Sequence, residues 1–181
     1  MVELLEFIKS SSKLYFSFKD RVDGYDYINT YVLWQEPYFL VLILSLWYYI
    51  LTTSQITILS IIGSIINFSL ATFLAISAFH YTMVFLGGIG TLKDMYKFGL
   101  SIWLFPSIIN LLAFIVSLIF QNSTISYILG VFLSLLGIYS IIISILIYGK
   151  VQNLSTEYTF LGMLIPFLIT SIILVLFKLT L

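Results

Sequence analysis

Long stretches of this chain carry no charged side chain, and this feature constrains the fold more than any other. Three such stretches run over residues 37–92, 98–149 and 158–177. A charged group at the centre of a membrane-spanning helix costs about 2.5–3.5 kcal/mol, so long uncharged tracts are typical of spans. As single helices the tracts would measure roughly 84, 78 and 30 Å, against a hydrocarbon core of about 30 Å. The first two therefore have to fold back on themselves.

Polar segments at residues 52–55 and 121–124 mark where those two tracts turn. The sequence thus predicts an all-α, polytopic transmembrane helical bundle with five spans. The second and third spans are overlong for a bilayer, so we expect them to tilt or to project from the lipid. The predicted transmembrane domain covers residues 37–178, with spans near residues 37–52, 56–86, 91–120, 125–149 and 156–178.

A cytoplasmic segment, residues 1–36, precedes the first span. Its first ten residues alternate apolar and charged positions at helical spacing, which predicts a short amphipathic helix on the leaflet. A frayed tail is the alternative, because ten residues barely support a helix alone.

The basic residues predict the orientation. Five spans place seven of the eight Lys and Arg residues on one side of the membrane and only Lys178 on the other. The positive-inside rule makes that side the cytoplasm, so the amino terminus is expected inside and the carboxyl terminus outside. The residues on the cytoplasmic side are Lys9, Lys13, Lys19, Arg21, Lys93, Lys97 and Lys150.

Composition narrows the function classes. Only 9% of the residues are charged and 61% are hydrophobic, whereas a soluble domain carries charge on about a quarter of its residues. The charges of the eight basic and eight acidic residues cancel, so the chain has no net positive charge that would attract nucleic acid. The chain has no cysteine and one histidine, so we expect no metal site and no cofactor. An isoleucine-rich, cysteine-free chain favours a prokaryotic cell membrane, which the protein would cross several times.

One loop is rich in glycine and is followed by a helix start. A threonine and an aspartate can cap that helix, and exposed amides with two lysines could hold a lipid phosphate or an acidic partner segment. A tight helix-loop-helix turn is the simpler interpretation. The loop residues are Gly87, Gly88, Gly90, Thr91, Lys93, Asp94 and Lys97.

Three strongly polar, uncharged residues lie within the predicted spans: Asn67, His80 and Asn110. Hydrogen bonds between helices are sufficient to explain all three, although the histidine could also titrate. Small residues recur along one face of the fourth predicted span, at Gly130, Ser134, Gly137 and Ser144. Another helix is expected to pack there, either from this chain or from a second copy.

The run over residues 80–109 resembles the signature of the Yip (Ypt/Rab-interacting protein) domain family of five-span membrane proteins. The matching positions are the glycine-rich loop, then Phe98-Gly99-Leu100-Ser101, then Pro106. Residues 148–169 are similar to the segment that joins the last two spans of that family. The element that eukaryotic members place before the first span is reduced to residues 34–37, so the chain looks most like the compact prokaryotic members.

This resemblance implies a non-catalytic membrane scaffold or adaptor, which associates through its spans and the glycine-rich loop and acts in membrane organisation or trafficking. Its partners would be the lipid bilayer, further copies of itself or other membrane proteins. A small-molecule or ion transporter or channel is the alternative. An enzyme is not expected, because the sequence shows no nucleophile with a base and no metal cluster.

Overall fold

The computed structural model describes residues 2–16, 21–33, 35–53, 56–120 and 123–180. Every regular element in these ranges is a helix, so the predicted all-α class is confirmed. Residues 54–55 and 121–122 of the predicted turns, with Lys19 and Trp34, lie outside the described residues. The helices are α1 (Val2–Phe16), α2 (Arg21–Tyr31), α3 (Gln35–Thr52), α4 (Ile58–Phe85), α5 (Leu92–Phe120), α6 (Ser123–Gln152) and α7 (Thr156–Thr180).

Helices α3 to α7 occupy the five predicted span ranges. Three of them, α4, α5 and α6, are long and apolar enough to cross a membrane, which suggests a membrane-embedded protein. The described apolar part of α7, Thr156–Ile172, is shorter. Helix α3 has 18 residues and begins with the polar Gln35 and Glu36.

The helices begin and end at recognisable caps. Helix α4 starts with a capping box, in which the Ser60 amide donates to Thr57 Oγ1 over 3.1 Å and the Thr57 amide donates to Ser60 Oγ over 3.0 Å. Helix α6 ends before Asn153, whose φ of 53° lies in the left-handed region. The amide of Leu154 then donates to the carbonyl of Gly149 over 2.9 Å.

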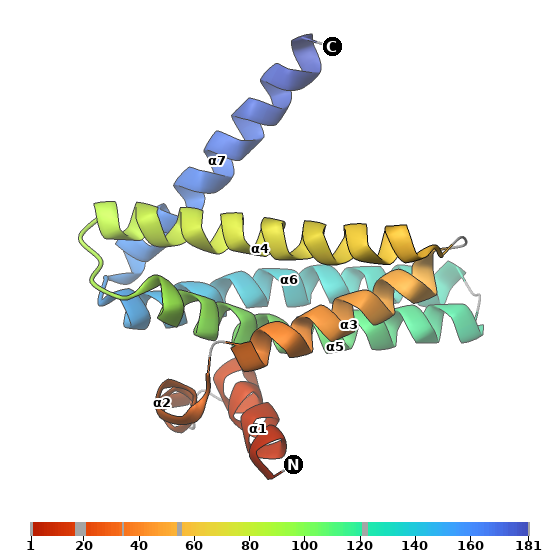
Figure 1. Cartoon of the computed structure of the whole chain (residues 1–181), viewed down its shortest axis with the longest axis horizontal. Helices are drawn as coiled ribbons and strands as arrows, with labels where there is room; N and C mark the ends of the chain where they lie inside the picture. The colour runs from red at the N-terminus through yellow and green to blue at the C-terminus, as the bar shows by residue number, and fades with distance from the viewer. Residues whose placement is uncertain (1, 17–20, 34, 54–55, 121–122, 181) are drawn as a thin grey trace.

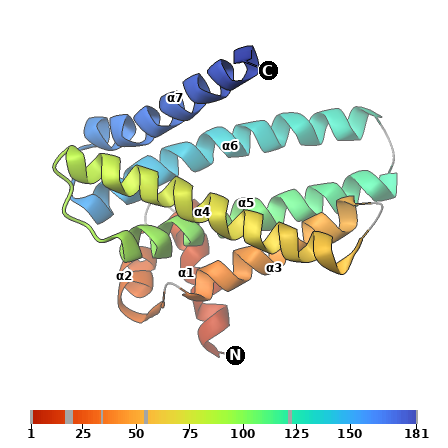
Figure 2. The same cartoon turned by 45° about the horizontal axis from the view of Figure 1, so that its top comes forward.

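Helices α4, α5 and α6 run alongside one another, and α3 packs across α4 and α5 (Figure 1). The turns at residues 86–91 and 153–155 lie together at one end of this bundle, on the left of Figure 1. Helix α1 crosses the bundle direction, and α2 lies beside the end that carries the two turns. Helix α7 packs on α4 and α6 at its start and then diverges from them (Figures 1 and 2).

The buried core lies near the end that carries the two turns, and the far ends of the long helices are exposed. Buried residues of α5 gather between Met95 and Leu104, and those of α6 between Ile143 and Tyr148. Toward the other end, large apolar side chains are uncovered, as at Ile66 and Ile128, each 60% exposed. Apolar surface of this kind is costly in water but not in lipid.

Helix α1 begins in the segment where the sequence predicted an amino-terminal helix, and it continues to Phe16. Its buried face centres on Phe7 and Leu14, whereas Leu4 and Leu5 of the predicted apolar face are exposed. Helix α2 was not predicted, because its sequence has no apolar periodicity and contains Gly24. A Cβ at this glycine would lie 2.7 Å from the Ser10 carbonyl, so the glycine lets α1 and α2 cross closely.

Candidate functional site

The glycine-rich loop begins with a Schellman motif that ends α4. The Gly88 amide donates to the Met83 carbonyl over 2.8 Å, and the Gly87 amide donates to the Val84 carbonyl over 3.0 Å. Gly87 has a φ of 100°, which side chains rarely tolerate. The first glycine of the loop is therefore required by the turn itself.

The rest of the loop is bound to the end of α6 through Gln152. The Ile89 amide donates to the Gln152 carbonyl over 3.0 Å, and the Gly90 amide donates to Gln152 Oε1 over 3.1 Å. Because that oxygen accepts from Gly90, the Gln152 amide nitrogen is the donor to His80 Nδ1, 3.0 Å away. This assigns His80 the neutral tautomer protonated at Nε2. His80 and Gln152 are both buried, and together they connect α4, the loop and α6.

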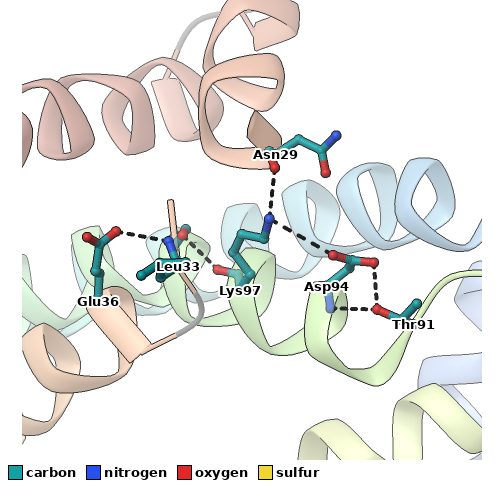
Figure 3. A network of polar contacts seen from close by, with 7 residues as sticks. Asn29, Leu33, Glu36, Thr91, Asp94 and Lys97 are labelled. Carbon is teal, nitrogen blue, oxygen red and sulfur yellow. Dashed lines mark hydrogen bonds and ion pairs between the residues drawn. The ribbon is translucent and has the colours of Figure 1, made fainter. Parts of the chain in front are cut away.

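Helix α5 begins at the predicted cap. Thr91 Oγ1 accepts from the Asp94 amide over 3.1 Å and donates to Asp94 Oδ2 over 2.6 Å. One turn later, Lys97 is buried, with Nζ donating to the Asn29 carbonyl of α2 over 2.9 Å and lying 4.0 Å from Asp94 Oδ1 (Figure 3). The Lys97 carbonyl accepts from Ser101 Oγ over 2.7 Å. Lys97 thus ties α2 to the start of α5.

An aromatic side chain of α2 completes this junction. Tyr25 stacks on Phe98 with ring centroids 4.4 Å apart, and Lys150 Nζ lies 3.7 Å from the centroid of the Tyr25 ring. Burial raises the pKa of Tyr25, with smaller contributions from the carboxylates of Asp94 and Asp26. The phenol therefore stays neutral at physiological pH.

The structure separates the residues that the sequence grouped as one loop site. The amides of residues 87–90 all donate to protein acceptors, and the two lysines differ in exposure. Lys97 is buried against α2, whereas Lys93 is exposed. This geometry agrees with the tight-turn interpretation, since the loop amides are already engaged.

The three predicted intramembrane polar residues also differ. His80 has the bond between helices that was expected of it. Asn67 and Asn110 are exposed on the side of the bundle. Asn110 lines a groove of about 340 Å³ with Ser45 and Tyr48, between α3 and α5.

The small-residue face of α6 is divided. Ser144 is buried, but Ser134 is exposed, and a Cβ at Gly130 or Gly137 would meet nothing within 4 Å. Within the described residues these positions are therefore open, although Gly130 also borders a groove that is lined by residues of α3 and α5. A shallow groove of about 430 Å³ runs beside Gly130 and Ser134.

Several residues that build the site were not singled out from the sequence. Gln152 and Asn29 act through contacts between segments far apart in the chain, which local patterns do not encode. The available signal was that Gln152 is a polar residue shortly after the end of the fourth predicted span at residue 149.

The comparisons with known proteins add no relative. No family model, no curated protein and no solved structure matches this chain.

Proposed function

We propose that the chain is a non-catalytic membrane scaffold or adaptor of the Yip-domain type, with five spans, a cytoplasmic amino terminus and an outer carboxyl terminus. One observation carries the proposal. The polar groups near the two turns bond to one another, whereas apolar side chains on the far halves of α4 and α6 are left exposed to neighbours. Such a molecule offers surfaces for association in the bilayer.

Within the bilayer, association between helices depends on close packing, which small residues permit. The uncovered Gly130, Ser134 and Gly137 supply such a surface for a second copy or another membrane protein. A second surface for association lies at the cytoplasmic boundary of the lipid. It consists of the glycine-rich loop, Lys93 and the two amino-terminal helices.

Affinity capture tests the scaffold directly. A tagged copy expressed beside an untagged one, crosslinked in native membranes and gently solubilised, should bring down itself or a membrane partner. Gly130→Leu, which adds bulk to the uncovered face, should weaken the capture, whereas Gly63→Leu on α4 is the matched control at an equally open glycine. Recovery of the tagged chain alone would refute the proposal.

A transporter or channel stays a second candidate because of the groove at Asn110. The groove lies within the apolar half of the bundle, and Ser45, Tyr48 and Ser107 line it beside Asn110. Polar groups at such a depth are found along substrate paths. Flux of ions or small solutes into vesicles that contain the purified chain, abolished by Asn110→Leu, would favour this candidate over a scaffold.

The proposed topology has its own test. The chain lacks cysteine, so a thiol reagent labels only the single cysteine that is introduced. Thr53→Cys, in the turn between α3 and α4, should react with an impermeant maleimide from outside intact cells. Lys93→Cys should react only after the membrane is opened. Reaction of both from the same side would rule out this arrangement.

A further inference from the structure

An apolar groove lies where the two amino-terminal helices meet the start of α3. It has a volume of about 800 Å³, which is within the usual range of about 300–1,000 Å³ for small-molecule sites. Phe7 of α1, Tyr27 and Tyr31 of α2 and Phe39 of α3 line it, with Glu36. The groove is therefore built by three helices, and none of its lining residues is among those that form the junction around the glycine-rich loop.

The described lining of the groove carries only negative charge. Glu36 is exposed, and it is the only charged residue among the described residues that line the groove. Its Oε2 accepts from the Leu33 amide over 3.0 Å, which orients the carboxylate beside the start of α3 (Figure 3). A positively charged group is favoured at this end, and an anionic one is repelled.

Aromatic rings line the same groove as the carboxylate. The rings of Tyr27 and Tyr31 have centroids 5.3 Å apart, and Tyr31 is 71% exposed. The face of a tyrosine ring attracts an ammonium group, and aromatic side chains with a carboxylate are suited to a quaternary or primary ammonium. The remaining wall, with Phe7 and Phe39, is apolar and suits a hydrocarbon chain.

The position of the groove indicates where its ligand comes from, given the membrane placement proposed above. Helix α1 crosses the bundle direction, as an interfacial helix does (Figure 1). Helix α3 begins its apolar run directly after Glu36. Headgroups and the first part of the acyl chains occupy this depth of a bilayer.

We propose that the groove binds one phospholipid whose headgroup ends in an ammonium, of the ethanolamine or choline type. The ammonium lies at Glu36 and over the ring of Tyr31, and an acyl chain lies along Phe7 and Phe39. A phospholipid with a glycerol headgroup carries only the negative charge of its phosphate. It therefore lacks the group that Glu36 selects.

The test is lipid binding to the purified full chain in detergent, measured by native mass spectrometry. The two probes are phosphatidylethanolamine and phosphatidylglycerol with identical acyl chains. The unaltered chain should bind the ethanolamine lipid about threefold or more tightly than the glycerol lipid, as a carboxylate and one ring face imply. Glu36→Gln should bring this ratio to about one, because glutamine still accepts from Leu33 but carries no charge.

Two further variants complete the design. Tyr31→Leu keeps the groove apolar and should lower the ratio by removing a ring face. Glu157→Gln removes an exposed carboxylate from the first turn of α7, outside the groove, and should leave the ratio unchanged. Equal binding of the two lipids by the unaltered chain, or an unchanged ratio in Glu36→Gln, would overturn the proposal. The scaffold would still stand, because its capture experiment does not depend on the headgroup.

Discussion

At the scale of single residues, the glycine-rich loop is limited by the space between it and α6. A Cβ at Gly90 would collide with the carbonyl of Val151, and one at Gly88 would lie 2.7 Å from Gln152 Oε1. Backbone atoms cannot rotate away as a flexible side chain can, so the loop itself would have to move. Glycine at residue 90 is thus a packing requirement, whatever the loop binds.

We therefore expect Gly90→Ala to lower the free energy of unfolding by about 1–3 kcal/mol, the usual cost of overpacking. Unfolding in mixed micelles titrated with dodecyl sulfate, followed by circular dichroism, measures this change. Gly63→Ala on α4 is the matched control, because its Cβ would meet nothing within 4 Å, alanine favours a helix by about 1 kcal/mol, and residue 63 lies outside the proposed association surface. Equal midpoints for the two variants would contradict the packing argument.

Lys97 offers a second prediction, since its ammonium is bonded to the Asn29 carbonyl over 2.9 Å. Lys97→Met leaves that carbonyl without its charged donor, and such bonds contribute about 1.5–3 kcal/mol. Amide hydrogen exchange in residues 21–31 should become faster, while exchange in the distant half of α6 stays the same. Lys93→Met, at an exposed position four residues earlier, should change neither region. If amide hydrogen exchange in α2 were the same in Lys97→Met as in the unaltered chain, the bond from Lys97 to Asn29 would not stabilise α2.

At the scale of elements, the sequence predicted those helices whose signals are local. Helix α4 ends at glycines, and α5 begins at the threonine and aspartate cap that the sequence indicated. Helix α2 escaped prediction because it is stabilised by Lys97 and by the stack of Tyr25 on Phe98, contacts that only the folded chain creates. The same reason explains why the loop was predicted but its partner Gln152 was not.

The docking of α1 is likewise a long-range feature. The hydroxyl of Tyr139 on α6 donates to the Tyr15 carbonyl over 2.6 Å, and Tyr15 Oη lies 2.5 Å from Ser140 Oγ. Burial raises the pKa of Tyr15, so its hydroxyl keeps its proton at neutral pH. These bonds hold the last turn of α1 against the middle of α6.

Tyr139→Phe should therefore release the end of α1. The lost hydrogen bond contributes about 0.5–1.5 kcal/mol, and amides near Phe16 should exchange faster by a corresponding factor of roughly 2–12. Tyr127→Phe removes a hydroxyl from a residue of α6 that is 74% exposed and should leave α1 unchanged. A similar effect from both substitutions would mean that the hydroxyl at residue 139 has no special role.

At the scale of the whole molecule, the long helices exceed a bilayer. Helix α4 has 28 residues and measures about 42 Å, so within a hydrocarbon core of about 30 Å it has to tilt or to project by about 12 Å. The hydroxyls of Tyr38 and Ser69, 2.6 Å apart, place the start of α3 beside the middle of α4. The charged Glu36 lies just before Tyr38, so under the five-span placement proposed above we expect the hydrocarbon region to end near this level.

We therefore expect the end of α4 at Phe85 to project from the lipid, on the side proposed to be cytoplasmic, while its other half stays in lipid. Because the chain has no cysteine, Phe85→Cys and Ile66→Cys can be compared in vesicles with a water-soluble maleimide. Both side chains are well exposed, at 89% and 60%, so protein packing does not shield either site. We expect fast labelling at residue 85 and almost none at residue 66, with both labelled after unfolding in dodecyl sulfate. Equal labelling of the two in vesicles would mean that α4 lies at another depth, and the level set by Glu36 would be wrong.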